Sequence, residues 1–149
     1  MFVLADVSQA KEWRGIAPLK STRADVEKLL GRSTHDGYGI SYPVGDEVAT
    51  FEYSSGGCSD KGRVYDVPPY TVLRIRVSSG HKPRFSDLEI DLRKFRKVED
   101  SELPDVLYYI NDEEGVAYEV QGGLVMTTEY WPTAKDRNMR RCVKRPRRA

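Results

Sequence analysis

At residues 70–77 the chain reads YTVLRIRV, and from Leu73 onward apolar and charged side chains alternate. Leu73, Ile75 and Val77 fall on one side of an extended strand, while Arg74 and Arg76 fall on the other. An apolar row opposite two arginines is typical of a sheet with one buried and one solvated face. The segment therefore predicts an antiparallel sheet that other elements cover on a single side.

A helix and a hairpin are predicted before this strand. The run from Thr22 to Gly31 has a capping residue, an acidic residue three positions later at Asp25 and a terminal glycine, which together predict a short helix. Two strands are predicted over residues 37–42 and 47–53, around a turn at 43–46. Residues 54–69 contain Ser, Gly and Pro and predict a long loop.

A similar order of elements is predicted after residue 85. A capping-box sequence begins at Ser86 and predicts a helix reaching Phe95, although the alternation of the apolar residues between them also fits a strand. A hairpin is predicted over 106–111 and 116–121, and a last strand over 124–131. The predicted fold class is α+β, a mostly antiparallel sheet with short helices on one face. Halves at 21–77 and 86–131 suggest a tandem helix–hairpin–strand repeat.

Charge is divided unevenly along the 149 residues. Residues 135–149 hold eight of the 24 Lys and Arg and one of the 23 Asp and Glu, so this end carries +7 and the rest −6. We expect a flexible stub at 1–12, one domain at 13–142 and a disordered basic tail at 143–149. A basic tail also suits nucleic acid or an anionic membrane surface. The acidic body, without interleaved aromatic and basic residues, predicts no specific nucleic-acid binding.

The cysteines and the first residues both bear on the compartment. Residues 1–10 resemble the end of a secretory signal, although an ordinary terminus explains them equally well, and no apolar run is long enough to cross a membrane. Cys58 and Cys142 form an even pair, which predicts a disulfide in an exported protein. Two unrelated thiols are the alternative. Cα atoms more than about 7 Å apart would exclude the bridge.

The sequence contains no recognisable catalytic or metal-binding motif. His35 and His81 lie in predicted loops without a second ligand at metal-binding spacing, and the acidic run at 112–114 lacks the surroundings of a calcium loop. Residues 57–62 have the glycine spacing of a phosphate loop, but Arg63 and Val64 follow where Lys and Ser or Thr are required. We therefore expect no metal and no cofactor, and we assign no catalytic residue.

The solvated side of the predicted sheet is the best candidate for an interaction surface. Arginine and tyrosine are enriched in protein interfaces, although Glu and Arg on a sheet can also simply pair across strands. If the apolar rows point inward, Thr50 and Thr127 point outward together with six candidate interaction residues: Glu52, Arg74, Arg76, Tyr109, Glu119 and Glu129.

The chain also resembles known bacterial proteins. Gly15-Ile16 and residues 21–31 (STRADVEKLLG) resemble the opening segment of the BamE/SmpA-like outer-membrane lipoprotein domains. The doubled element order is similar to that of the β-lactamase inhibitory protein fold. Residues 13–19 and 130–136 resemble a group of uncharacterised bacterial exported proteins, over nearly the whole chain. The resemblance implies an exported tandem α/β fold and brings no established activity with it.

These observations favour a non-enzymatic protein-interaction module that is exported or belongs to the cell envelope. We expect a monomer with an unidentified protein partner, located in the periplasm or outside the cell. The alternative is a small-ligand binder, or a hydrolase-type enzyme, that uses the 54–69 loop as a lid.

Overall fold

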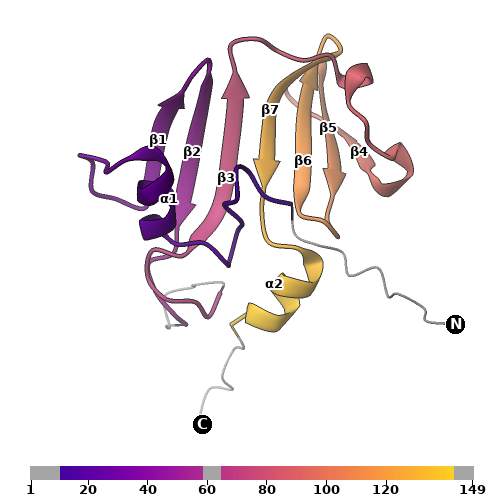
Figure 1. Ribbon diagram of the computed structural model, residues 1–149. Coiled ribbons are helices and arrows are strands. Elements are labelled where there is room, and N and C mark those ends of the chain that lie inside the picture. Colours follow the sequence, from indigo (N-terminus) through magenta and orange to yellow (C-terminus); the bar gives the residue numbers. More distant parts are fainter. Residues whose placement is uncertain (1–10, 59–64, 143–149) are drawn as a thin grey trace, which may run out of the picture.

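Seven strands form a single antiparallel sheet in a computed structural model, which describes residues 11–58 and 65–142 (Figure 1). The strand order is β1-β2-β3-β7-β6-β5-β4. The first half of the chain therefore contributes β1–β3, the second contributes β4–β7, and the halves meet where β3 pairs with β7. The prediction of a mostly antiparallel sheet with few helices is confirmed. The strand bounds are β1 Gly39–Val44, β2 Glu47–Tyr53, β3 Val72–Ser79, β4 Arg96–Glu99, β5 Val106–Asn111, β6 Val116–Gln121 and β7 Leu124–Tyr130.

Helix α1 (Arg23–Leu30) begins and ends where the sequence predicts. The Thr22 backbone N–H donates to the Asp25 carboxylate at 2.8 Å, and the Asp25 N–H donates to the Thr22 hydroxyl at 3.4 Å. This reciprocal pair satisfies two backbone donors that the first turn leaves free. Gly31 follows the helix with a φ of 94°, which glycine adopts without strain.

The core lies between one face of β1–β3 and the elements packed on that face. Val26 of α1 is fully buried against this sheet, together with Phe51 and Ile75. Trp13, from the segment that precedes α1, packs edge-on against Phe51 with ring centroids 5.8 Å apart. Burying side chains of this size stabilises the fold by roughly 1.5–3 kcal/mol each, so these contacts fix which face of the sheet is covered.

The predicted helix from Ser86 to Phe95 is wrong. The described chain has an extended residue there, Leu88, with φ −73° and ψ 129°, and its neighbours form only two 3-10 turns. The two turns are Phe85–Asp87 and Leu92–Lys94. The tandem repeat is therefore not confirmed, because the two halves share the antiparallel strands but not the helix.

Aromatic stacking explains why the 85–95 segment stays extended. Phe85 stacks on Tyr109 with ring centroids 4.1 Å apart, and Phe95 packs on Tyr118 at 5.8 Å. The backbone before it is tied to the start of β7, because Val125 N–H donates to the Pro83 carbonyl at 2.8 Å. Residues 85–95, which we call the strap, thus cover the second half of the sheet in an extended conformation. This conformation agrees with the strand-like alternation of the apolar residues in the segment.

Helix α2 (Ala134–Arg140) and strand β4 are elements that the sequence pattern did not predict. Thr133 caps α2 by accepting a hydrogen bond from the Asp136 N–H at 3.0 Å, which is the same spacing as Thr22 and Asp25. All four residues of β4 are exposed, so this edge strand carries no alternation to detect. Helix α2 lies beyond the end of β7, below the sheet in Figure 1.

The predicted terminal segments fall largely outside the described residues. The basic tail at 143–149 lies entirely outside them, as do residues 1–10 of the expected stub. Lys11 is described, and it contacts the β5–β6 hairpin. Its backbone N–H donates to the Glu114 carbonyl at 3.5 Å, and its ammonium lies 3.7 Å from the Glu114 carboxylate.

Candidate functional site

The strand register gathers seven of the eight outward-pointing residues predicted from sequence on one side of the sheet. Cross-strand partners project from the same side, so the pairs Glu52–Arg74, Arg76–Glu129 and Glu119–Thr127 define a common surface. Helix α1, Trp13 and Phe85 all pack on the opposite side. We call this surface the polar face; its members are Thr50, Glu52, Arg74, Arg76, Glu119, Thr127 and Glu129.

Tyr109 does not belong to the polar face, so the prediction that it points outward with the other seven residues is wrong. It pairs with Tyr118 across β5 and β6, whereas Tyr108 pairs with Glu119, and successive residues of a strand point to opposite sides. Tyr109 is therefore turned toward the strap, where it stacks on Phe85. Tyr108 takes its place, and its hydroxyl donates to the Asp100 carboxylate at 3.2 Å.

Four charged residues of the polar face pair with one another. The Glu129 carboxylate receives Arg74 at 2.6 Å and Arg76 at 2.9 Å, and Arg76 also lies 4.0 Å from Glu119. The two arginine side chains are 43% and 50% exposed, so each contact contributes only about 0.2–1 kcal/mol. The cross-strand pairing that the sequence allowed is thus present, and it fixes the orientation of both guanidinium groups.

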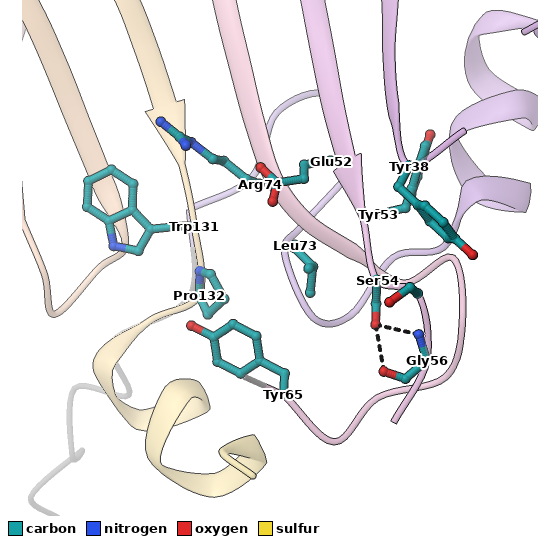
Figure 2. A pocket seen from close by; sticks show the side chains of 11 residues that line it. Tyr38, Glu52, Tyr53, Ser54, Gly56, Tyr65, Leu73, Arg74, Trp131 and Pro132 are labelled. Carbon is teal, nitrogen blue, oxygen red and sulfur yellow. Dashed lines mark hydrogen bonds between the residues drawn. The ribbon is translucent and has the colours of Figure 1, made fainter. Parts of the chain in front are cut away.

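A groove of about 450 Å³ opens where β2 and β7 end and β3 begins, at the edge of the polar face (Figure 2). Leu73 lies in the middle of this view, with Tyr65 and Pro132 on one side and Tyr38 on the other, while Glu52 and Arg74 lie above. Burial raises the pKa of the Tyr65 hydroxyl above its ordinary value of 10.0, so this hydroxyl remains a hydrogen-bond donor at neutral pH. The remaining lining residues are Tyr53, Ser54, Ser55, Gly56 and Trp131.

A β-bulge places Leu73 in the groove. The register between β2 and β3 shifts after Glu52, so that Tyr53 pairs with Val72 and Leu73 has no cross-strand partner. Val72 is fully buried instead, while Leu73 is only half-buried. Strict alternation predicts Leu73 in the apolar row, and the extra residue of the bulge moves it out of that row.

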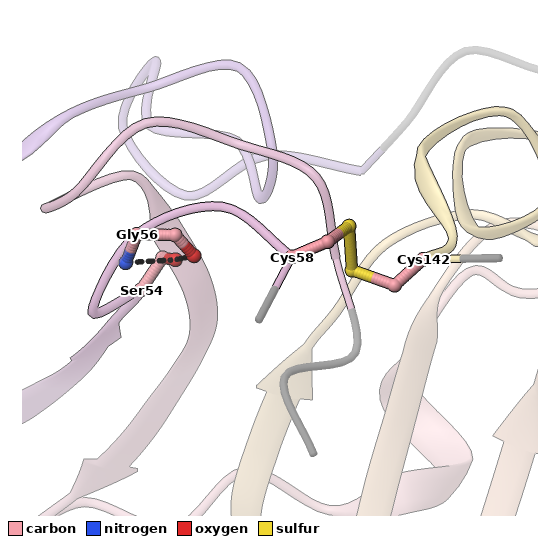
Figure 3. Close-up of a disulfide and its surroundings, with 4 residues drawn as sticks. All are labelled: Ser54, Gly56, Cys58 and Cys142. Atoms are coloured by element: carbon pink, nitrogen blue, oxygen red, sulfur yellow. Dashed lines mark hydrogen bonds between the residues drawn. A yellow bond between two sulfur atoms is a disulfide. The ribbon is translucent and has the colours of Figure 1, made fainter. Parts of the chain in front are cut away.

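The Cys58–Cys142 disulfide ties the loop beside the groove to the end of α2, as predicted (Figure 3). The two Cα atoms are 5.6 Å apart, within the range that a bridge requires. A second link is formed by the backbone, because Asp66 N–H donates to the Arg140 carbonyl at 2.7 Å. The described parts of the loop are thus fixed beside the groove at both ends, and the disulfide indicates an oxidising, exported environment.

A stack of three side chains continues one wall of the groove. Tyr38 stacks on Tyr70 with ring centroids 5.7 Å apart. The guanidinium of Arg23, the first residue of α1, lies 5.5 Å from the centre of the Tyr70 ring. Tyr70 has a φ of 62°, an unusual backbone conformation for a residue other than glycine. The two rings are 48% and 42% exposed, so this part of the surface presents aromatic groups to solvent.

Other sites considered from the sequence stay apart from this surface. His35 and His81 are exposed, and His81 lies 3.7 Å from Asp46. Within residues 11–58 and 65–142, no group of three or more His, Cys, Asp or Glu side chains is arranged to hold a metal ion. None of the helices in that part of the chain has the length and apolar character needed to cross a membrane.

Comparisons with protein families, with curated proteins and with solved structures found no match to this chain.

Proposed function

We propose that this protein is an exported, non-catalytic binding module that contacts a protein partner through the polar face and the adjoining groove. The observation that carries the proposal is the continuity of these two surfaces. Glu52 and Arg74 belong to the polar face and also line the groove, while the described elements that cover the sheet pack on its other side.

The physical character of this surface suits protein recognition. Aromatic and arginine side chains supply most of the energetically important contacts in protein interfaces, and both occur here. Arg74 and Arg76 are held in place by Glu129, so they lose little side-chain entropy when a partner binds. The charged rim would mainly set orientation and association rate, and the groove would provide the contact area.

Export is the proposed setting for this binding. The disulfide supports it, since such bonds persist mainly outside the reducing cytosol. The resemblance to BamE/SmpA-like domains and to bacterial exported proteins points the same way. We place the protein in the periplasm or outside the cell, as a monomer.

A small-ligand binder is the second candidate, and the groove is the observation that favours it. Its volume of about 450 Å³ lies within the range of roughly 300–1,000 Å³ that ligand sites occupy. A hydrolase would need a second acid or an activated nucleophile beside Glu52, which is the only carboxylate among the described residues lining the groove. The described geometry therefore favours binding over hydrolysis.

Photocrosslinking from defined positions tests the proposed function. A benzoylphenylalanine at Thr127, on the polar face, should crosslink a specific protein from the exported fraction of cells that make this chain. The same probe at Leu103, which is 56% exposed between β4 and β5, serves as the control. Adding Arg76→Glu should weaken the Thr127 crosslink. Crosslinking from Leu103 alone, or equally from both positions, would contradict the proposal.

A further inference from the structure

Glu52 differs from every other charged residue of the polar face. Arg74, Arg76, Glu119 and Glu129 contact one another, as described above. The Glu52 side chain is exposed and has neither a hydrogen bond nor an ion pair to any described residue, although Arg74 is its cross-strand neighbour. It therefore presents a carboxylate whose charge no described side chain compensates, at the mouth of the groove.

The charge of Arg74, the arginine that lines the same groove, is already compensated by a carboxylate. The Arg74 guanidinium lies 2.6 Å from the Glu129 carboxylate, and a second arginine, Arg76, shares that carboxylate. An anionic ligand would have to compete with Glu129 for Arg74 and would be repelled by Glu52. A cationic ligand meets a carboxylate that no described residue pairs with, so it displaces no ion pair within the described residues.

The aromatic walls favour a cation as well. The faces of tyrosine and tryptophan rings attract ammonium and guanidinium groups, and the groove is lined by Tyr38, Tyr65 and Trp131. A cation–π contact already exists beside the groove, where the Arg23 guanidinium lies over the ring of Tyr70. That ring in turn stacks on Tyr38. Leu73 and Pro132 add apolar surface that suits the methylene stem of a long side chain.

We propose that the groove is a receptor for an arginine side chain presented by an extended segment of the partner protein. Its guanidinium pairs with Glu52 and lies against the aromatic walls, and its stem covers Leu73. Arginine is favoured over lysine because its planar group both stacks on rings and binds a carboxylate with two hydrogen bonds. The groove's continuity with the polar face favours a polypeptide over a free small cation.

Charge around the groove is uneven, because Arg137 and Arg141 of the basic segment lie near Tyr65, whereas Glu52 and Tyr38 belong to the acidic part of the chain. Residues 1–134 carry a net charge of −6, and the basic excess of the chain is confined to residues 135–149. The inference rests on the proposed function, since it names the chemistry by which the partner is recognised.

A matched pair of peptides tests the inference. The full-length oxidised protein is titrated with Ac-Gly-Gly-Arg-Gly-Gly-NH2, and chemical shifts are followed by NMR. The control peptide carries citrulline, which has the shape of arginine without its charge. The arginine peptide should shift the resonances of Glu52, Ser55 and Leu73, and its affinity should fall as NaCl is added. The citrulline peptide should bind at least about fivefold more weakly.

Variants locate the interaction. Glu52→Gln should weaken binding of the arginine peptide about fivefold, the upper range for one exposed charge pair. Tyr38→Leu should weaken it about two- to fivefold, through loss of the cation–π contact. Glu89→Gln, which removes an exposed carboxylate on the strap, should leave binding unchanged. Equal affinity for both peptides, an indifferent Glu52→Gln, or shifts confined to another surface would overturn the inference.

A neutral sugar tests the alternative that the groove binds a saccharide and not an arginine side chain. Cellobiose shifting the groove resonances, with no effect from the arginine peptide, would overturn the inference and make the groove a saccharide site. Crosslinking from Thr127 combined with an indifferent Glu52→Gln would overturn only this inference and leave the proposed function standing. Absence of any Thr127 crosslink in the protein without a second substitution would contradict the proposed function itself.

Discussion

Asp100 organises the turn between β4 and β5 with a single carboxylate. It accepts hydrogen bonds from the backbone N–H groups of Glu102 and Leu103, each at 2.9 Å, and from the Tyr108 hydroxyl at 3.2 Å. The two backbone donors contribute most to lowering the pKa of Asp100 below its ordinary value of 3.8. Because the folded-state pKa is lowered, the charged carboxylate stabilises the fold above the unfolded pKa. That contribution is lost as the pH falls through the folded pKa.

The Asp100→Asn variant should therefore show a stability deficit that depends on pH. Its free energy of unfolding should be lower than that of the unmodified protein at pH 7, and the deficit should be smaller at pH 3, because the contribution of the charged carboxylate falls once the pH drops below the unfolded pKa. Urea unfolding at both pH values measures the difference. Asp105→Asn, a neighbouring exposed carboxylate, is the control and should show little deficit. A deficit of equal size at pH 7 and pH 3 would contradict this account of Asp100.

Individual residues also show how far the candidate site could be predicted from sequence. Arg74 and Arg76 were placed correctly because they alternate with Ile75 and Val77, which are buried. Tyr109 was misplaced because it has a tyrosine neighbour, so the alternation there does not say which ring faces the core. The groove could not be predicted, since its walls come from Tyr38, Tyr65 and Trp131, which only the folded sheet and the disulfide bring together.

At the level of elements, two similar capping sequences have different outcomes. Thr22 and Asp25 form a capping box at the start of α1, whereas Ser86 opens no α-helix. Helix α1 has Val26 to bury against the core, while the 85–95 strap buries aromatic rings along an extended path. A capping sequence therefore leads to a helix only where the apolar residues that follow it can also pack against the core from one helical face.

This contrast predicts different costs for two matched substitutions. Thr22→Ala should lower the free energy of unfolding by about 1 kcal/mol, the usual cost of losing an N-cap side chain. Ser86→Ala should change it by less than about 0.5 kcal/mol, because Ser86 is exposed and caps no helix. Urea denaturation of both variants measures the costs. A loss at Ser86 as large as that at Thr22 would show that the strap depends on the Ser86 hydroxyl.

At the scale of the whole molecule, the disulfide links two segments that are 84 residues apart in sequence. It holds the loop after β2, whose first residues line the groove, to the end of α2 (Figure 3). In the chain-entropy model, closing a loop of this length stabilises the folded state by about 4–5 kcal/mol, and strain reduces the benefit.

Removing the Cys58–Cys142 disulfide should lower the free energy of unfolding. The double variant Cys58→Ser, Cys142→Ser should lose up to about 4–5 kcal/mol of unfolding free energy, measured by urea denaturation. A phosphine reductant should lower the stability of the unmodified protein by a similar amount and leave the double variant unchanged, which controls for effects of the reductant itself. Unchanged stability of the unmodified protein after complete reduction would contradict this role.

The overall arrangement was predictable in class but not in detail. Alternation in residues 70–77 and the hairpin at 106–121 indicated an antiparallel sheet with one wet face. Nothing local indicates that β3 pairs with β7 and joins the two halves, since partners 50 or more residues apart, such as Arg76 and Glu129, are chosen by the packing of the whole sheet.

Hydrogen–deuterium exchange of the complex with the crosslinked partner tests the central claim most directly, namely that the polar face and its groove form the binding surface. The partner should slow exchange in residues 50–56, 73–76 and 127–132, which carry the polar face and the groove. Exchange in the 85–95 strap should stay unchanged, because the strap covers the other side of the sheet. Protection confined to the strap, with residues 50–56 and 73–76 exchanging as in the free protein, would contradict the claim.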